Sequence, residues 1–401
     1  MSFLKSDKQI KMIQQGVEEI IPIDELKQKL DNSRKENKPL VIKLGCDPSR
    51  PDLHIGHAVV LRKLRQFQDL GHQAVLVIGD FTAMIGDPSG RNKTRPQLTL
   101  EEAKKNAESY IEQAKIILDI KSLKICNNSD WLNSMNFSNV VELTSKYTVA
   151  RMMERDDFEK RFKAEVSITI HEFLYPLAQA MDSVHLKADI ELGGTDQKFN
   201  LLVGRDIQRE YGQDPQVILT LPLMEGTDGK EKMSKSYDNH IGITDSPDEM
   251  YGKTLSIPDN MIEKYFLLAA NYDKKKMGEI KKRLSDKKVN PRDVKRELAR
   301  KIVEIYYSLD HAKRAEGNFD KIFIKKDIPE DIPKIKLDED TLIVDILISN
   351  ELVKSKSEAR RLIDQGAVKI NDEKCIDRDH IVRKDDSLII KVGKRRFLKI
   401  I

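Results

Sequence analysis

The sequence has few cysteines and no long apolar run. Its three cysteines, Cys46, Cys126 and Cys375, are an odd number at scattered positions, which excludes a disulfide framework and a CxxC metal site. No segment approaches the roughly 18 apolar residues that a membrane-spanning helix needs, so we expect no membrane-embedded part. The first 31 residues show neither a signal-peptide core nor an Arg/Ser-rich transit pattern, and we expect a cytoplasmic protein.

The sequence also lacks the two common glycine-rich phosphate loops. No GxGxxG follows the first expected strand and no GxxxxGK[ST] occurs, so a nucleotide must be held by other means. Apolar runs at 39–44 and 73–78 nevertheless predict buried parallel strands, and the apolar period of 56–69 predicts a helix between them. This βαβ unit indicates a Rossmann-like α/β fold whose ligand lies beyond the carboxyl ends of the strands.

The remaining periodic segments indicate how the chain is divided. Helical patterns occupy 101–118, 137–149, 168–181, 261–269, 274–285 and 291–308, with a strand at 217–221. The stretch 325–340 has two prolines, many charges and little apolar content, which is typical of a linker. We therefore expect a catalytic α/β domain over 1–238, a helical domain over 239–324, this linker, and a small α+β module over 341–401.

The charge of the chain is unevenly distributed. There are 70 Lys and Arg against 66 Asp and Glu, a formal net charge of +4. Residues 341–401 contain 14 basic and 10 acidic side chains, so the whole excess lies in the last module. This distribution favours a catalytic role for the neutral N-terminal part and binding of a nucleic-acid backbone by the basic C-terminal module. The alternative is a solvated basic surface without a partner.

The first candidate site is His54-Ile-Gly-His57, in the turn between the first strand and its helix. Free backbone N–H groups and the helix dipole at such a turn favour an anion, and imidazole N–H donors suit phosphate oxygens. Gly56 leaves room for a ligand to approach the backbone. Alone, the tetrapeptide would also fit two histidines that cap a helix.

The second candidate site is the loop Lys232-Met-Ser-Lys-Ser236, preceded by Gly226 and Gly229. Alone it would fit a solvated basic turn. Together, in this order on an α/β domain, the histidine pair and the lysine loop resemble the signature motifs of class I aminoacyl-tRNA synthetases. The glycines would let the loop close on a leaving pyrophosphate and open afterwards.

That resemblance implies adenylate formation from an amino acid and ATP, with Mg²⁺ held mostly by phosphates and water. The amino-acid carboxylate attacks the α-phosphate in line, so the site must position the reactants and stabilise moving negative charge. The implied catalytic residues are His54, His57, Lys232, Lys235, Ser236, Arg91 and Arg95. The implied ATP contacts are Gly45, Asp47, Ser49, His54, Gly56, His57, Gly194, Asp196 and Lys235. No residue is assigned to a metal.

A third group of polar residues indicates which amino acid is used. Tyr175, Gln179 and Asp182 lie at i, i+4 and i+7, so they share one face if this segment is helical, with an exposed polar stripe as the alternative. Together with Leu192-Gly-Gly-Thr-Asp196-Gln197 and Ile85-Gly-Asp87-Pro-Ser-Gly90, they resemble the bacterial tyrosyl-tRNA synthetase family.

The family resemblance implies a role for each of these residues. Asp87, Tyr175 and Gln179 would hold the ammonium group of tyrosine, and Asp182 would accept a hydrogen bond from its phenol hydroxyl. The ribose of ATP would meet Gly194 and Asp196. The implied substrate-binding set is Lys43, Asp47, Thr82, Asp87, Tyr175, Gln179, Asp182 and Gln197.

Lys43 departs from the family pattern. Many members have Tyr four residues before the Asp-Pro, as a second partner for the phenol, and this chain has Lys. Either Lys43 supports Asp182 electrostatically, or it points elsewhere and the hydroxyl has one protein partner fewer.

The basic module resembles the S4 RNA-binding domain over 345–371. Ser355 is expected to cap a helix and Gly366 to end it before a strand at 368–370. The side chains expected to meet phosphates are Lys354, Lys356, Arg360 and Arg361.

The resemblance covers nearly the whole chain and has consequences for its partners. It implies a tRNA(Tyr) substrate besides L-tyrosine and ATP, a helical anticodon-binding domain over 239–324, and a homodimer with its interface in 101–153. Two alternatives stay open: a tryptophanyl-type synthetase, and a relative that binds RNA without catalysis.

Overall fold

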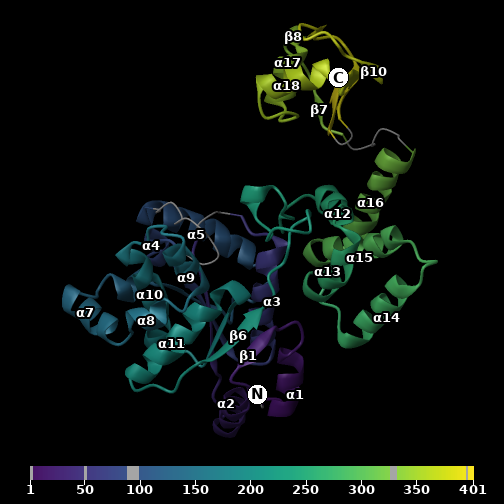
Figure 1. The fold of residues 1–401 in the computed structure, drawn as a ribbon. Helices are drawn as coiled ribbons and strands as arrows, with labels where there is room; N and C mark the ends of the chain where they lie inside the picture. The colour runs from purple at the N-terminus through teal and green to yellow at the C-terminus, as the bar shows by residue number, and fades with distance from the viewer. Residues whose placement is uncertain (1–2, 49–51, 88–98, 326–331, 394–395) are drawn as a thin grey trace. The chain divides into compact units, whose positions relative to one another are not determined.

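The computed structural model describes residues 3–48, 52–87, 99–325, 332–393 and 396–401 (Figure 1). The chain forms two compact units, Met1–Leu309 and Asp310–Ile401. In the part that is described, no helix is both long and apolar enough to span a bilayer.

A six-stranded sheet forms the centre of the first unit. Its order is β1-β6-β5-β2-β3-β4, and every neighbouring pair is parallel except β1 with β6. The strands are β1 (Glu19–Ile21), β2 (Val41–Cys46), β3 (Gln73–Ile78), β4 (Lys124–Asn127), β5 (Ile190–Gly194) and β6 (Val217–Leu221). The order reverses at β2, which lies between β5 and β3, so a crevice opens at the carboxyl ends of these strands. The expected α/β class is confirmed.

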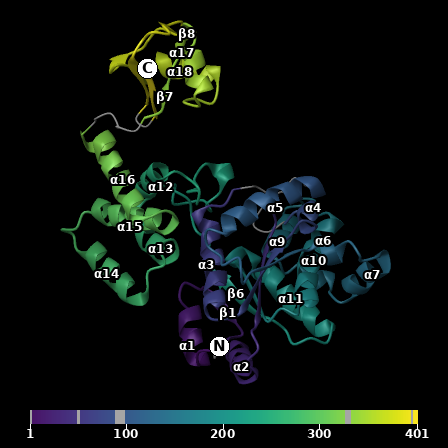
Figure 2. The ribbon, with the colours of Figure 1, turned by 180° about the vertical axis from the view of Figure 1, so that it is seen from behind.

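Helices cover both faces of this sheet. α3 (Ile55–Asp69) lies on one side, and α10 (Ile170–Leu186) and α11 (Lys198–Glu210) pack against each other on the other side (Figures 1 and 2). The strands can therefore be apolar on both faces, as the buried run of β3 shows. The other helices of this region are α1 (Ser6–Ile13), α2 (Ile23–Glu36), α4 (Thr82–Ile85), α5 (Leu100–Ala114), α6 (Ser129–Leu132), α7 (Phe137–Ser145), α8 (Val149–Met152) and α9 (Asp156–Lys163).

A helical region follows in the same unit. Its helices are α12 (Pro247–Leu255), α13 (Ile262–Leu268), α14 (Lys274–Ser285) and α15 (Pro291–Tyr306). They enclose buried Tyr251, Phe266 and Leu298. Arg62 of α3 donates a hydrogen bond to the Tyr306 hydroxyl at 2.7 Å, which ties the helical region to the sheet region.

The second unit has its own apolar core. α16 (Leu309–Asp320) precedes two small sheets, one of order β10-β9-β12-β13-β7 and one of β11 with β8. Its elements are β7 (Lys334–Ile335), β8 (Thr341–Leu342), α17 (Ile343–Ser349), α18 (Lys356–Asp364), β9 (Val368–Ile370), β10 (Glu373–Lys374), β11 (Ile381–Val382), β12 (Leu388–Val392) and β13 (Arg396–Ile400). Ser355 caps α18 through the Glu358 N–H, and Gly366 follows the helix at φ +62°, as expected.

Part of the expected linker is structured. Lys334–Ile335 forms β7, which pairs in parallel with β13, and Ile332 is buried. A two-residue strand directly after Pro333 has too little alternation to be recognised from sequence, because its pairing partner lies some 65 residues further along the chain. The expected boundary at 340/341 therefore lies inside the C-terminal fold.

Truncation of Ile42 should weaken the sheet. Ile42 is fully buried in β2, and we expect Ile42→Ala to lower the free energy of unfolding by about 2–5 kcal/mol. Trp131, the single tryptophan, packs near Val75 and Val77 and reports on this region, so urea unfolding can be followed by its fluorescence. Ile23→Ala, at a 38% exposed position, should cost less than about 0.5 kcal/mol. Equal losses would contradict the assignment of β2 to the core.

Candidate active site

A cavity of about 640 Å³ lies in the crevice at the reversal of strand order. It is bounded by the carboxyl ends of β2 and β5, the start of α3 and the lysine loop. Sixteen of the residues singled out from the sequence line it: Gly45, Asp47, His54, Gly56, His57, Thr82, Asp87, Tyr175, Gln179, Asp182, Gly194, Asp196, Gln197, Lys232, Lys235 and Ser236.

The two histidines open helix α3. His54 is the N-cap residue, and its backbone N–H donates to Nδ1 of His57 at 3.3 Å. The two rings stack with their centroids 3.7 Å apart. Burial is the main cause that lowers the pKa of His54 to about 2, and the nearby His57, His240 and Lys232 contribute to this value. His54 is therefore neutral at physiological pH and contributes hydrogen bonds rather than charge.

The lysine loop reaches across the same cavity. Lys232 Nζ lies 2.5 Å from Oδ2 of Asp196, beyond the end of β5, and Lys235 forms an ion pair with Asp52, just before the histidine motif. Both lysine side chains are about half exposed. Such half-exposed ion pairs are weak. A phosphate that enters the cavity can therefore displace the two carboxylates from the ammonium groups.

A buried asparagine holds the backbone of this loop. The Asn239 side chain accepts a hydrogen bond from the Ser234 N–H at 2.8 Å and donates to Asp228 Oδ2 at 3.0 Å. The next residues pair with the histidine motif, because the Ile55 N–H donates to the Ile241 carbonyl at 2.9 Å. The catalytic region therefore continues past residue 238, where the sequence pattern had placed its end.

Asp47 links β2 to two other elements at the cavity wall. Its Oδ1 accepts a hydrogen bond from the Thr82 hydroxyl and its Oδ2 from the Tyr175 hydroxyl, each at 2.7 Å. A Cβ atom at Gly79 would lie 2.1 Å from Asp47 Oδ1, so only glycine fits beside this arrangement.

Asp87 is held at another part of the cavity wall. Gln197 Nε2 donates to its Oδ2 at 2.8 Å, and Arg155 Nη2 lies 3.5 Å from its Oδ1. Arg155 is 4% exposed, so it is a buried cation that the sequence motifs did not reveal.

Asp182 lies on the face of α10 shared with Tyr175 and Gln179, as expected. Trp131 Nε1 donates to its Oδ1 at 2.9 Å, and Asn128 Nδ2 lies 3.4 Å from its Oδ2. Burial raises the pKa of Asp182 to about 7, against the attraction of Lys43 and the two hydrogen bonds. Its charge therefore depends on pH in the physiological range.

Lys43 does not line the cavity. Its side chain is fully buried, and its ammonium group bonds to Glu191, Ser183 and the Gln179 carbonyl. The expectation of a direct substrate contact is thus replaced by a contact beneath the pocket. Both alternatives from the sequence apply in part, since Lys43 points away from the cavity and still acts on Asp182 electrostatically.

The remaining expected residues are not in the described part of the cavity lining. Ser49, Arg91 and Arg95 are outside the described residues. Lys354, Lys356, Arg360 and Arg361 are exposed in the second unit, on α18 and just before it.

The residues that sequence reasoning missed support others. Asn128 and Trp131 hold Asp182, Glu191 holds Lys43, and Asn239 holds the lysine loop. Two signals were present: Glu191 directly precedes the Leu192-Gly-Gly motif, and Asn239 closely follows the lysine loop. The sequence does not reveal which groups the side chains at these two positions contact.

A second cavity, of about 990 Å³, lies beside α13 and α14. Its lining mixes acidic Glu18, Asp259 and Glu263 with three lysines, and the described residues around it include no histidine. The smaller cavity is the better candidate, because it brings together imidazoles, ammonium groups and a buried carboxylate.

Comparisons with known proteins agree with this geometry. Residues 35–324 match the family described as tRNA synthetases class I (W and Y), and residues 324–400 match the tyrosine–tRNA ligase SYY-like C-terminal domain. The tyrosine–tRNA ligase of Chlorobaculum tepidum is 55% identical over 100% of this chain and 98% of its own length. That of Thermotoga maritima is 53% identical over 98% of this chain and 97% of its own.

Solved structures show the same fold at low identity. The tyrosyl-tRNA synthetase of Archaeoglobus fulgidus, solved with L-tyrosine, superposes with a TM-score of 0.62 at 22% identity, covering 77% of this chain and 99% of that one. A truncated mitochondrial tyrosyl-tRNA synthetase of Aspergillus nidulans gives 0.62 at 21% identity, covering 80% of this chain and 94% of that one. The chain thus belongs to the tyrosine–tRNA ligase family of class I aminoacyl-tRNA synthetases.

Proposed function

We propose that this protein activates L-tyrosine with ATP, releasing pyrophosphate, and transfers the tyrosyl group to the 3′-terminal ribose of tRNA(Tyr). The observation that carries the proposal is that one cavity brings His54, His57, Lys232 and Lys235 together with Asp182. These residues come from distant parts of the chain, and they combine groups that suit a triphosphate with a carboxylate that suits a phenol. The reaction belongs in the cytoplasm, where ATP and tRNA meet.

Adenylate formation follows from the positions of the charged groups. The tyrosine carboxylate attacks the α-phosphorus of ATP, a new P–O bond forms, and the bond to the pyrophosphate oxygen breaks. Lys232 and Lys235 neutralise charge that moves onto the pyrophosphate, and the imidazoles of His54 and His57 donate hydrogen bonds to phosphate oxygens. Ser236 adds a hydroxyl from the same loop. Arg91 and Arg95 are proposed to join this group.

ATP is proposed to lie along the carboxyl ends of β2 and β5. Gly45 has no neighbouring atom where a Cβ would stand, which leaves room for the nucleotide beside Asp47. Gly194 and Asp196 meet the ribose, so Lys232 exchanges its partner Asp196 for phosphate when ATP binds. Gly56 and Ser49 complete the proposed contacts.

Tyrosine is proposed to lie across α10. Its ammonium group meets Asp87, Tyr175 and Gln179. Gln197 donates a hydrogen bond to Asp87 and lies near the carboxylate of the substrate tyrosine. The phenol hydroxyl donates to Asp182 at the closed end of the pocket. Asp47 and Thr82 hold Tyr175 in place.

Mg²⁺ is proposed to enter with ATP. Within the described residues, no three His, Cys, Asp or Glu side chains are grouped so as to hold a metal ion. The chain therefore offers the ion no cage of its own there, and phosphate oxygens and water suit its preference for oxygen ligands.

tRNA binding is proposed for the two regions that follow the catalytic domain in the sequence. Lys354, Lys356, Arg360 and Arg361 are exposed around α18 and suit contacts with the phosphate backbone. The helical region over 239–324 is proposed to reach the anticodon.

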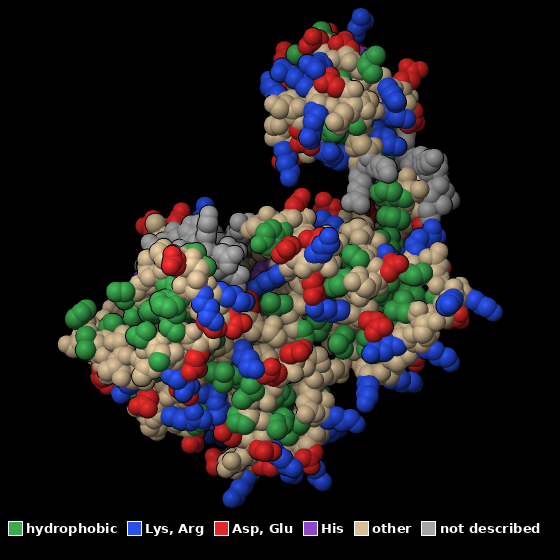
Figure 3. Space-filling model, viewed as in Figure 1, with side chains coloured by type: hydrophobic (Ala, Val, Ile, Leu, Met, Phe, Trp, Pro, Cys, Tyr) green, Lys and Arg blue, Asp and Glu red, His purple; other side chains and the backbone are tan. Residues whose placement is uncertain are grey.

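A homodimer is proposed on the basis of an apolar surface over α7 to α10. Four side chains there are at least two-thirds exposed: Phe137 (82%), Val149 (67%), Phe162 (70%) and Ile170 (81%). Their helices share one buried cluster around Leu143 and Phe158, and Figure 3 shows apolar side chains gathered over α7. Such a patch is typical of an interface. It extends to Ile170, beyond the 101–153 segment expected from the resemblance.

The activity should depend on the lysine loop. The wild-type chain should exchange pyrophosphate into ATP with tyrosine and not with tryptophan. Lys235→Ala should lower kcat of this exchange by about 10²–10³, because it removes a charge that stabilises the leaving pyrophosphate. Lys230→Ala, an exposed lysine of the same loop outside the cavity lining, should change kcat less than about twofold. No exchange by the wild type would refute the proposed function.

Asp182 should set the preference for tyrosine. Asp182→Ala should lower kcat/KM for tyrosine by about tenfold to a hundredfold, because a charge-assisted hydrogen bond is lost. The kcat/KM for phenylalanine should fall less, so the ratio of kcat/KM for tyrosine to that for phenylalanine should decrease. A preference equal to that of the wild type would show that the phenol lies elsewhere.

The apolar surface should hold two copies together. Phe137→Glu/Ile170→Glu should convert a dimer to a monomer in sedimentation experiments, because it places charges in an apolar interface. Ile376→Glu, at a 75% exposed position of the second unit, should leave the mass unchanged. A monomeric wild type would contradict the proposed dimer.

A further inference from the structure

A buried ion pair lies beneath the tyrosine pocket and takes no part in the reaction described above. Lys43 of β2 and Glu191 of β5 occupy opposite positions on neighbouring parallel strands. Their side chains are 0% and 1% exposed, and Lys43 Nζ lies 2.9 Å from Glu191 Oε1. Burying two charges costs about as much as their attraction returns, so stability alone does not account for this pair.

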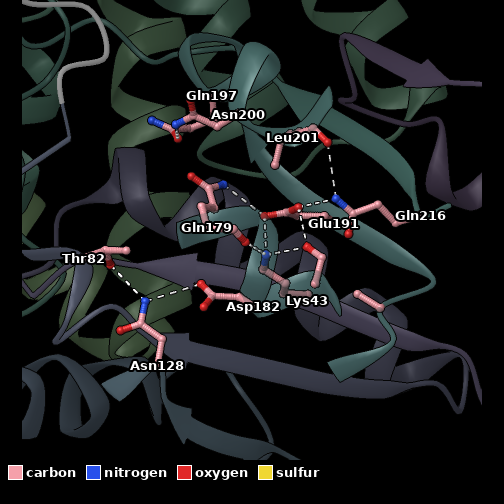
Figure 4. Close-up of polar contacts among 12 residues, drawn as sticks. Lys43, Thr82, Asn128, Gln179, Asp182, Glu191, Gln197, Asn200, Leu201 and Gln216 are labelled. Atoms are coloured by element: carbon pink, nitrogen blue, oxygen red, sulfur yellow. Dashed lines mark hydrogen bonds and ion pairs between the residues drawn. The ribbon is translucent and has the colours of Figure 1, made fainter. Parts of the chain in front are cut away.

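Every polar atom of the pair has a partner. The Lys43 ammonium also donates to the Ser183 hydroxyl at 2.7 Å and the Gln179 carbonyl at 2.9 Å. Glu191 Oε2 accepts hydrogen bonds from Ser183 and Gln216 (Figure 4). Because both charged groups are fully hydrogen-bonded, the side chains of Lys43 and Glu191 each have one favoured orientation.

The network reaches the pocket through Gln179. The Gln179 side-chain amide donates from Nε2 to Glu191 Oε1 at 3.0 Å. An ionised carboxylate only accepts hydrogen bonds, so it fixes which end of the amide faces it. The amide oxygen of Gln179 then points away from Glu191, as Figure 4 shows, and Gln179 lines the cavity.

The network also reaches Asp182, one turn further along α10. Lys43 is the largest charge that favours the ionised form of Asp182, and Glu191 opposes it weakly. The other groups in contact with Asp182 are the neutral donors Trp131 and Asn128. His185 of α10 stacks on the Trp131 ring.

We propose that the Lys43–Glu191 pair is a positioning device of the tyrosine pocket, which holds the Gln179 amide oxygen toward the substrate ammonium group and supplies the positive charge that acts on Asp182. This inference rests on the proposed function. It assigns Lys43 and Glu191 as positioning residues, which act on the substrate through Gln179 and Asp182.

Removing both charges should weaken tyrosine binding. In Lys43→Met/Glu191→Gln, residue 191 can both donate and accept, so the Gln179 amide is no longer fixed. We expect KM for tyrosine in pyrophosphate exchange to rise about tenfold to a hundredfold, while KM for ATP and kcat change less than about threefold. Lys63→Met, which removes a buried cation bonded to the carbonyls of Ile13 and Gln15 outside the cavity, should leave KM for tyrosine unchanged.

Removing Lys43 alone should shift the pH profile. Asp182 has a pKa of about 7, so kcat/KM for tyrosine should fall as pH drops below that value and the carboxylate takes up a proton. Lys43→Met removes the attraction that favours the carboxylate, so the falling limb should move to higher pH by about one unit. A merely structural role would lower activity without moving this limb.

The outcomes separate the two proposals. If the wild type shows no tyrosine-dependent exchange, the proposed function fails. If the wild type is active and the double variant keeps both its KM for tyrosine and the wild-type pH profile, the positioning role is wrong. Should the charge-removing variants not fold, Ser183→Ala keeps both charges and loosens the pair. It should raise KM for tyrosine about two- to tenfold, and an unchanged KM would overturn the inference.

Discussion

The reversal of strand order at β2 is the constraint on which the site depends. β2 lies between β5 and β3, and the carboxyl ends of these parallel strands open at the same edge of the sheet. The histidine motif follows β2, and the Gly-Gly-Thr-Asp motif ends β5. Segments about 140 residues apart in the chain therefore bound one cavity, and the lysine loop needs only to fold over that edge.

The polar groups of this cavity are held in place by buried partners. Asp47 receives hydrogen bonds from Thr82 and Tyr175, Asp182 from Trp131 and Asn128, and Lys43 is neutralised by Glu191. A polar group that leaves water must find such a partner. The same requirement fixes the orientation of each side chain before a substrate arrives, which is the preorganisation that catalysis needs.

Much of the framework could be predicted from local patterns. The strand expected at 73–78 and the helix at 274–285 lie where the structure has β3 and α14, because apolar period and flanking turns act over a few residues. The strand Lys334–Ile335 could not be predicted, because it exists only through its pairing with β13. Motif spacing identified sixteen residues of the cavity lining, but not the side chains that support them.

The sequence by itself determined the fold class, the family motifs and the charge asymmetry of the chain, since these depend on residue type and local order. The role of Lys43 shows what it left open. The sequence was compatible with a Lys43 side chain that contacts the substrate and with one that points away from the pocket. Only the tertiary structure decided, because the pairing of β2 with β5 places Glu191 opposite Lys43 and removes both from water. A partner brought by strand pairing, almost 150 residues away in the chain, leaves no local pattern.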